Sequence, residues 1–366
     1  MKIGFVYLGP LKYRGRLFKQ IQTLQQAGFD CMLVHGRTEP VEPDYSQYSF
    51  PVLPIRVIQE RAKLLTLASQ LNFDRKASRL LEQSEVDTVV CVGLTSALAG
   101  ALAKKRNPRL RFIFDSNELE LESYSSRIKQ IVWGRIQNHI LAYPDVVMHA
   151  EQHRLDYFHQ TYKTQAHPFL LENLPFFRET NSQKDKTEVV RCVYVGGFMP
   201  QRHCAEMLQA FADSSLPVGW TFDMVGFYAS RSYEDTIQQL LMGMDLERIR
   251  ILPPVAHNEM YQLLTDYDIG LAFYENTDLN NYYCAPNKVY DYLQMGMPVI
   301  TNDYPGLIDI VASNRAGVCL PEVTPQGIQT AIKTIEAEGL SHNISREVRQ
   351  RYSWENQVER YLQLFA

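Results

Sequence analysis

The feature that most constrains this chain is an alternation of short β-branched runs with segments of helical periodicity. In the first half, helical patterns, including those at 17–27, about 61–83 and 128–141, separate apolar runs at 2–8, 31–36, 88–93, 111–115 and 145–149. Strands that alternate with helices of about 10 to 15 residues indicate a parallel sheet covered by helices on both faces. The first half therefore predicts an α/β, Rossmann-like domain.

The alternation stops at 171–186, where prolines give way to a polar run without periodicity, and this segment is the expected linker. It then restarts with apolar runs at 189–197, 220–226, 248–255, 268–274 and 298–303. We therefore expect a second Rossmann-like domain. The predicted boundaries are 1–172 for the first domain and 173–352 for the second.

Charge is distributed unevenly between the two halves. Residues 1–175 carry 22 basic and 17 acidic residues, a net charge of +5, whereas residues 176–366 carry 15 and 24, a net charge of −9. The overall composition, 45% hydrophobic and 21% charged, is that of an ordinary globular protein. Six widely spaced cysteines without a C-x-x-C pair predict a reduced, cytoplasmic chain. The longest uncharged stretch, 88–103, is too short to span a bilayer.

Ligands of open α/β sheets bind beyond the carboxyl ends of the strands, so the segments after the strands are the candidate sites. In the first domain, Gly9 is followed by the basic residues Lys12, Arg14 and Arg16. This loop lacks G-x-G-x-x-G, which argues against a dinucleotide site. The loop favours an anionic acceptor, and a solvated helix start is the alternative.

In the second domain, Gly196 and Gly197 end a strand, and Arg202 precedes the next helix. Glycines allow the backbone to approach a phosphate, a helix N-terminus offers N–H groups, and arginine can bind two phosphate oxygens. The pattern is therefore typical of a phosphate site, although a plain turn after a strand is also common.

The segment 285–300, APNKVYDYLQMGMPVI, predicts a helix that begins at Pro286 and Asn287 and ends at Gly296. Lys288 and Asp291 are three residues apart and should share one face of this helix. A cation in the first turn and a carboxylate one turn later suit a phosphate next to a vicinal diol. A surface ion pair is the alternative interpretation.

Taken in order, these motifs resemble the C-terminal half of family-four, GT-B-fold, retaining glycosyltransferases. The resemblance extends over roughly 170 residues, through VYVGG, Arg202, ILPPV, DIGLAF, PNKxxDYLxMGxPVI, NDYPG and RYSWENQ, and in the first half through FDSNE and ENLPFF. It implies two Rossmann-like domains facing each other across a cleft, the first binding the acceptor and the second the nucleotide sugar. It also implies that a C-terminal helix at about 353–366 packs back on the first domain.

Site roles follow from the resemblance. Gly196 and Gly197 would pack against the donor diphosphate, Arg202 and Lys288 would neutralise it, and Asp291 would bind the ribose hydroxyls. The backbone around Ile251 would contact the nucleobase. On the acceptor side, the basic loop after the first strand makes Gly9 and Arg14 the candidate binding residues.

Two positions depart from the family pattern. The first glutamate of the family's acidic pair is replaced by Tyr283, so the donor sugar would be contacted differently or by the main chain of Cys284, Ala285, Pro286 and Asn287. In FDSNE, relatives often carry histidine where this chain has Asn117. An amide can only hydrogen-bond and cannot exchange a proton, which leaves the role of that histidine open.

The predicted activity is transfer of a hexosyl group from a nucleotide sugar to a hydroxyl of a glycan or lipid-linked acceptor, with retention. UDP-sugars are favoured and GDP-sugars are the alternative. We expect no cofactor, because the nucleotide sugar is a substrate, and no metal, because Asp266-Tyr267-Asp268 precedes its strand rather than following it. A nucleotide-sugar epimerase of the same fold and a catalytically degenerate binding scaffold are the alternative functions.

The positive first domain suggests an anionic acceptor or peripheral contact with the inner face of a membrane, and no nucleic-acid partner is expected. An amphipathic surface for lipid could be formed by Tyr13, Tyr124, Arg127, Lys129, Trp133 and Arg135. A helix packed on its own sheet explains the apolar positions equally well. The acids around Asn117, at positions 115, 118, 120 and 122, are for the most part interpreted as a polar helix start.

Overall fold

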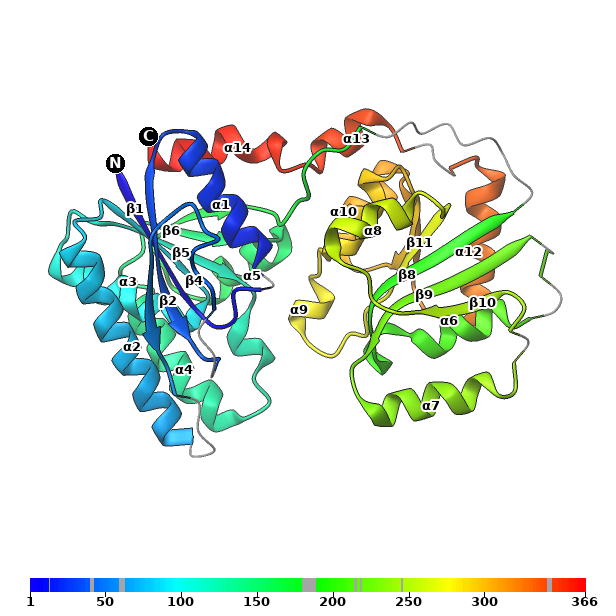
Figure 1. Ribbon diagram of the computed structural model, residues 1–366, viewed down its shortest axis with the longest axis horizontal. Helices are drawn as coiled ribbons and strands as arrows, with labels where there is room; N and C mark the ends of the chain where they lie inside the picture. The colour runs from blue at the N-terminus through cyan, green and yellow to red at the C-terminus, as the bar shows by residue number, and fades with distance from the viewer. Residues whose placement is uncertain are drawn as a thin grey trace. The chain divides into compact units, whose positions relative to one another are not determined.

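In a computed structural model, the chain divides into two compact units, residues 1–172 with 358–366, and residues 173–357 (Figure 1). The structure describes residues 1–12, 14–39, 43–58, 63–179, 189–213, 216–217, 219–244, 246–340 and 344–366. Three predicted features reach beyond these residues: Tyr13, the start of the long helix at 61, and the linker after residue 179. Each unit is a parallel sheet covered by helices on both faces, which confirms the prediction of two Rossmann-like domains.

The first unit contains a seven-stranded sheet of order β3-β2-β1-β4-β5-β6-β7. Its strands are β1 (Lys2–Leu8), β2 (Asp30–Arg37), β3 (Val52–Arg56), β4 (Thr88–Val92), β5 (Arg111–Asn117), β6 (Val146–His149) and β7 (His167–Leu170). Its main helices are α1 (Gly15–Gln26), α2 (Lys63–Gln83), α3 (Leu94–Arg106), α4 (Arg127–Ile140) and α5 (Gln152–Thr161), and a short 3₁₀ turn, η1, spans Glu120–Ser123.

The second unit contains a six-stranded sheet of order β10-β9-β8-β11-β12-β13. Its strands are β8 (Val190–Phe198), β9 (Trp220–Tyr228), β10 (Ile249–Leu252), β11 (Ile269–Ala272), β12 (Val299–Asn302) and β13 (Gly317–Leu320). Its helices are α6 (Cys204–Phe211), α7 (Arg231–Leu241), α8 (His257–Leu264), α9 (Leu279–Tyr282), α10 (Asn287–Gln294), α11 (Pro305–Ile310), α12 (Pro325–Ala337) and α13 (Arg346–Arg351), and η2 (Pro200–Arg202) precedes α6.

The order of the strands reverses once in each sheet, between β1 and β4 and between β8 and β11. Loops diverge to opposite faces of the sheet at such a switch point, which opens a crevice at the carboxyl ends of the two strands. Gly9 and Gly93 follow β1 and β4, and Gly196 lies near the end of β8, opposite the chain that leaves β11. The fold therefore brings the candidate residues of each domain to its switch point.

The sequence analysis missed three strands, β3, β7 and β13, and each is the edge strand of its sheet. An edge strand pairs on one side only and therefore tolerates residues that interrupt a central strand. β3 contains Pro54, β7 contains Pro168, and β13 begins at Gly317, whose φ of +143° places it in the region that glycine favours. These residues masked the periodicity that revealed the central strands.

The last helix, α14 (Glu355–Leu362), reaches the first unit. Tyr361 is completely buried there, and its hydroxyl donates to Oε1 of Gln20 on α1 at 3.1 Å. The ring of Phe365 lies 6.2 Å from that of Phe29, centroid to centroid. The end of the chain is therefore part of the core of the first unit.

Candidate functional site

The second unit places two glycines on neighbouring strands at its switch point. Gly196 on β8 pairs with Gly226 on β9, and their φ angles are +148° and +157°. A Cβ on Gly226 would lie 1.8 Å from the carbonyl oxygen of Gly196, and a Cβ on Gly196 would lie 2.9 Å from Nζ of Lys288. Side chains are excluded at both positions, because other atoms of the protein fill the space in which each Cβ would lie, and this lets the two strands and Lys288 pack closely together.

Arg202 and Lys288 come together on one aromatic ring although they are far apart in the sequence. The guanidinium carbon of Arg202 lies 4.1 Å from the ring centroid of Tyr274, and Nζ of Lys288 lies 5.7 Å from the same centroid. Lys288 also sits 4.0 Å above the ring of Tyr194, whose hydroxyl donates to the carbonyl of Gly197 at 2.8 Å. Two cations beside half-buried glycine backbone form a site suited to a diphosphate.

The environment of Lys288 perturbs its charge. Burial, followed by repulsion from Arg202, lowers the pKa of Lys288 to about 7. The ammonium of Lys288 is therefore partly deprotonated near neutral pH until an anion binds beside it. A perturbed lysine next to an arginine, at the switch point of an α/β sheet, is typical of a functional site.

Asp291 lies on the same helix as Lys288 but makes its contact with a different element. It is only 6% exposed, and its Oδ1 accepts a hydrogen bond of 2.6 Å from the hydroxyl of Tyr261 on α8. The guanidinium carbon of Arg178 stacks 3.4 Å from the ring centroid of Tyr261. Asp291 is therefore positioned from outside its own helix, a feature that the sequence pattern did not predict.

The other donor-side candidates occupy two loops and an edge strand. Tyr283 ends α9, Cys284 is buried, and Pro286 stands at the N-cap of α10 in extended conformation without a side-chain cap. Asn287 accepts a hydrogen bond from the amide of Asn173 at 2.9 Å, and Ala285 packs against the surrounding core. Ile251 pairs with Met224 of β9, and β10 is the edge of the sheet on that side.

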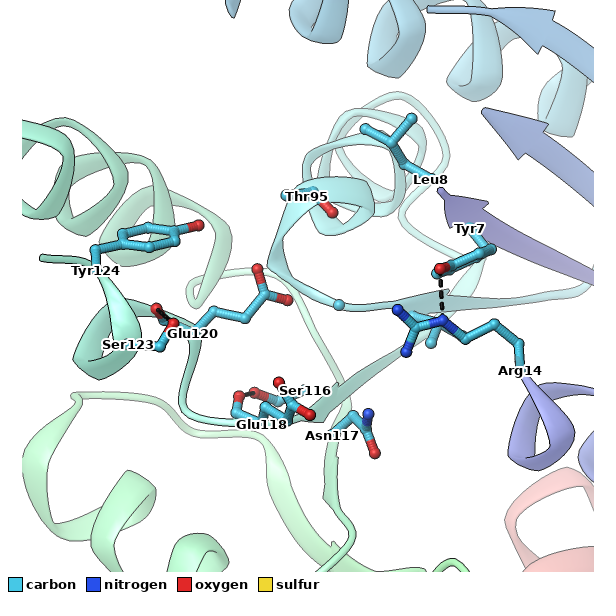
Figure 2. A pocket seen from close by; sticks show the side chains of 12 residues that line it. Tyr7, Leu8, Arg14, Thr95, Ser116, Asn117, Glu118, Glu120, Ser123 and Tyr124 are labelled. Atoms are coloured by element: carbon cyan, nitrogen blue, oxygen red, sulfur yellow. Dashed lines mark hydrogen bonds between the residues drawn. The ribbon is translucent and has the colours of Figure 1, made fainter. Parts of the chain in front are cut away.

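The first unit contains a pocket of about 270 Å³ at its own switch point. Figure 2 shows the lining side chains: Tyr7, Leu8, Arg14, Thr95, Ser116, Asn117, Glu118, Glu120, Ser123 and Tyr124, with Val92 and Gly93 completing the wall. Nε of Arg14 donates to the hydroxyl of Tyr7 at 2.5 Å. The φ of Gly9 is +131°, and its carbonyl oxygen accepts a hydrogen bond of 2.8 Å from Nε2 of the buried His35, which holds the loop after β1.

The basic loop of the first domain is less available to an anion than its sequence suggests. Arg16 is buried, forms an ion pair with Asp115 at 2.5 Å and donates to the carbonyl of Leu171 at 2.9 Å. Its charge is therefore used to hold α1 on the sheet. Arg14 keeps a place in the pocket wall, and its Nε is engaged by Tyr7.

Asn117 lines the pocket from the end of β5 in a left-handed conformation, with φ +52°. A β-bulge interrupts the pairing with β6 between Asp115 and Asn117. Its Oδ1 accepts from Arg16 at 3.2 Å, and since arginine only donates, the NH₂ group is what Asn117 can offer to a ligand. Asparagine is also one of the few residues that tolerate this backbone conformation.

Glu120 is the most perturbed carboxyl group of the pocket. Its Oε1 accepts a hydrogen bond of 2.6 Å from the backbone N–H of Leu94, the first residue of α3. Figure 2 shows its carboxyl group between Tyr124 and Arg14. Burial raises its pKa to about 7, although the Leu94 hydrogen bond acts in the opposite direction. Gly93 makes this contact possible, because a Cβ there would lie 2.8 Å from Oε1.

Several residues of these sites were missed by the sequence analysis. Tyr194 and Tyr274 were regarded only as parts of buried strands, and Glu120 was interpreted as part of a polar helix start. For Tyr274 and Glu120 the useful signal was their position just after the end of a strand near a switch point, whereas Tyr194 lies within β8. That signal becomes readable only when the order of strands in the sheet is known.

The described residues lack both a metal-binding cluster and a membrane-spanning helix. Within them, no group of three or more His, Cys, Asp or Glu side chains is arranged to hold a metal ion. Asp268 of the D-x-D sequence instead accepts from the backbone N–H of Arg191 at 2.8 Å. No helix in the described part of the chain is both long and apolar enough to cross a membrane.

Comparison with solved structures identifies the fold. Sucrose-phosphate synthase from Thermosynechococcus elongatus matches with a TM-score of 0.77 and 15% identity, over 100% of this chain and 98% of that chain. HepE from Anabaena, in complex with UDP-glucose, matches with a TM-score of 0.74 and 14% identity over 100% and 99%. The lipopolysaccharide outer core galactosyltransferase WaaB matches with a TM-score of 0.73 and 12% identity over 100% of both chains. The fold is therefore that of the GT-B glycosyltransferases.

A second comparison, with models of protein families, concerns the second unit. Residues 189–337 match the family model described as glycosyl transferases group 1, and this matched segment includes Arg202 and Lys288. A comparison with curated protein sequences finds no match. The second unit thus matches the glycosyl transferases group 1 model over most of its length, and together with the fold of the whole chain this match supports a glycosyltransferase. The resemblance inferred from the sequence motifs is confirmed at this level.

Proposed function

We propose that this enzyme transfers a hexosyl group from a nucleotide sugar to a hydroxyl of a glycan or lipid-linked acceptor, with retention at the anomeric carbon. The observation that carries the proposal is the convergence of Arg202 and Lys288 on Tyr274, beside the side-chain-free backbone of Gly196. This geometry supports binding of a diphosphate. UDP is the favoured nucleotide, and the complexes of the structural neighbour HepE with UDP-glucose and UDP are consistent with it.

In the proposed reaction, the bond between the anomeric carbon and the donor diphosphate breaks, and negative charge develops on the departing phosphate oxygen. Arg202 and Lys288 stabilise this charge. The departing oxygen takes the proton of the acceptor hydroxyl, and the new glycosidic bond forms on the same face of the sugar. Asp291 binds the ribose hydroxyls, and the main chain from Tyr283 to Asn287 faces the donor sugar. The donor is consumed as a substrate, and the reaction uses neither a cofactor nor a metal.

We assign the acceptor to the first unit, where Arg14, Gly9 and Asn117 surround the pocket at the β1/β4 switch point. In this assignment, Asn117 offers its NH₂ group to a substrate hydroxyl and takes no part in proton transfer. The position of the pocket at the carboxyl ends of β1, β4 and β5 supports this role.

Peripheral contact with the inner face of a membrane is supported by helix α4. Ile128 and Ile131 are 76% and 57% exposed, and Arg127, Lys129 and Arg135 accompany them on a helix without acidic residues. Exposed apolar side chains flanked by cations suit an anionic lipid surface. The apolar Trp133, in contrast, is buried within the first unit and belongs to the core. We include a cytoplasmic location of the chain in this proposal.

Donor-dependent release of UDP or GDP tests the donor site. Arg202→Ala, Lys288→Ala and Asp291→Ala should each lower the rate by at least tenfold, whereas Lys333→Ala, on the exposed face of α12, should leave it unchanged. Wild-type rates in the Arg202 and Asp291 variants would overturn the assignment. Product analysis without acceptor separates the alternatives, because an epimerase converts its donor and a binding scaffold leaves it intact.

A further inference from the structure

The pocket of the first unit has a local charge opposite to that of its domain. The half of the chain that contains it carries a net charge of +5, yet the lining includes one cation, Arg14, against the two carboxyl groups of Glu118 and Glu120. The Nε of Arg14 is already bonded to Tyr7. Arg16, the other arginine of the loop, is buried in its ion pair with Asp115. Net charge per domain therefore does not describe what the pocket can bind.

The helix N-terminus at this pocket is already occupied by the protein. In Rossmann-like domains the first N–H groups of such a helix form a natural site for phosphate or carboxylate. Here the N–H of Leu94 at the start of α3 donates to Oε1 of Glu120 at 2.6 Å. An anionic ligand in the pocket would displace this bond and would also face the carboxyl groups of Glu120 and Glu118.

The remaining polar side chains of the lining are uncharged: the hydroxyls of Tyr7, Thr95, Ser116, Ser123 and Tyr124 and the amide of Asn117. The hydroxyls of Tyr7, Ser116 and Ser123 already donate to backbone carbonyls at 3.4, 3.1 and 2.8 Å, so they can accept a hydrogen bond from a ligand but not donate one. Uncharged acceptors together with the NH₂ donor of Asn117, around a small volume, suit the hydroxyl groups of a sugar. The volume, about 270 Å³, is sufficient for one sugar ring rather than a longer chain.

We propose that this pocket binds a neutral sugar at the reacting end of the acceptor, that Glu120 accepts a hydrogen bond from its hydroxyls, and that the pocket excludes sugars carrying a carboxylate or phosphate on that ring. The inference rests on the proposed function and makes its acceptor more specific. It replaces the anionic acceptor expected from net charge. Any anionic or lipid part of the acceptor then lies outside this pocket.

Saturation-transfer NMR on the full chain at pH 8 tests the proposal. The probes are methyl glycosides of glucose, galactose, mannose and N-acetylglucosamine, and the matched methyl uronides and 6-phosphates. At least one neutral glycoside should bind, and its anionic counterpart should bind at least tenfold more weakly. Equal or tighter binding of the anionic counterparts, or no binding by any neutral member, overturns the proposal.

Variants locate the effect. Glu120→Gln keeps an oxygen that can accept from the Leu94 N–H but removes the charge. The affinity for the neutral glycoside should therefore fall by about fivefold to tenfold, and the preference over its anionic counterpart should become smaller. Glu118→Gln should reduce only the preference for the neutral glycoside over its anionic counterpart and should leave the affinity for the neutral glycoside unchanged. Glu82→Gln, an exposed residue of α2, is the matched control and should behave as wild type. Unchanged binding in Glu120→Gln overturns the proposal, and thermal melting of each variant verifies its fold.

A separate assay distinguishes this inference from the proposed function. Donor-dependent nucleotide release without acceptor reports on Arg202 and Lys288 and does not involve Glu120. If wild type consumes a donor but Glu120→Gln leaves sugar binding unchanged, the acceptor inference alone fails. If neutral glycosides bind through Glu120 and no donor is consumed, the proposed function fails and the pocket assignment stands.

Discussion

The ammonium of Lys288 occupies the space in which a side chain at residue 196 would lie. A Cβ on Gly196 would be 2.9 Å from Nζ of Lys288, and the φ of Gly196, +148°, is one that glycine alone adopts readily. The glycine on β8 and the lysine on α10 therefore form one structural unit. This relationship explains why a glycine is needed at this position independently of any ligand.

Gly196→Ala should consequently damage both the fold and the donor site. Strained backbone and displacement of Lys288 should lower the free energy of unfolding by about 1–3 kcal/mol and reduce nucleotide release by at least tenfold. Chemical denaturation and the release assay measure the two effects. Gly134→Ala is the control, because a Cβ there, within helix α4, meets its nearest atom at 4.0 Å and should be neutral or slightly stabilising. Full activity in Gly196→Ala would contradict the prediction.

Donor affinity should depend on pH through Lys288. Because burial and Arg202 lower its pKa to about 7, the side chain is charged below this pH and increasingly neutral above it. A bound diphosphate favours the charged form, so affinity for UDP-glucose should be constant below about pH 6.5 and fall by up to about tenfold per pH unit above pH 7. Titration calorimetry in two buffers measures the accompanying proton uptake. Lys288→Arg stays charged and should show a flat profile; a flat wild-type profile would refute the assignment.

Tyr261→Phe tests how Asp291 is positioned. Loss of the 2.6 Å hydrogen bond leaves a buried carboxyl oxygen without this donor, which should destabilise the protein by about 1–3 kcal/mol. The KM for the donor should rise several-fold while kcat changes less, because the effect acts through ribose binding. Tyr143→Phe in the first unit is the control. An unchanged KM together with a large loss of kcat would show that Tyr261 acts elsewhere.

Two substitutions separate the backbone and side-chain roles of Asn117. At φ +52°, Asn117→Gly keeps the conformation, whereas Asn117→Ala adds about 1 kcal/mol of backbone strain. We therefore expect Ala to be the less stable of the two by thermal denaturation. Both should lose transferase activity to the same extent if the amide binds substrate. Wild-type activity in Asn117→Gly would show that only the backbone conformation matters.

Liposome sedimentation tests the surface of α4. Replacing Ile128 and Ile131 together by aspartate should abolish binding to vesicles that contain anionic lipid, and raised salt should weaken wild-type binding. Both side chains are exposed, so stability should be unaffected. The same change at Ile308, which is also exposed but lies on α11, serves as the control. Equal sedimentation of wild type and the double variant would exclude this surface.

The predictability of the two sites differed for a physical reason. Arg202 and Lys288 could be nominated from sequence because each stands in a short motif, Arg202 shortly after a strand and Lys288 in the first turn of a helix, where local chemistry is informative. Glu120 could not, since its role depends on the N–H of Leu94, 26 residues earlier in the chain. Tyr274 shares the limitation: it contacts Arg202 and lies near Lys288 only because β8 and β11 are neighbours in the sheet.

The sequence by itself determined the two-domain α/β architecture, the central strands and the family of the second domain, because hydrophobic periodicity and short motifs are local properties of the chain. Only the tertiary structure decided which charges are available to a ligand. Arg16 forms a buried ion pair with Asp115, and Nε of Arg14 donates a hydrogen bond to Tyr7. Burial and the nearby Arg202 lower the pKa of Lys288. Whether a charged side chain can bind a ligand depends on its burial and on partners that are distant in sequence. Both depend on the order of the strands in each sheet.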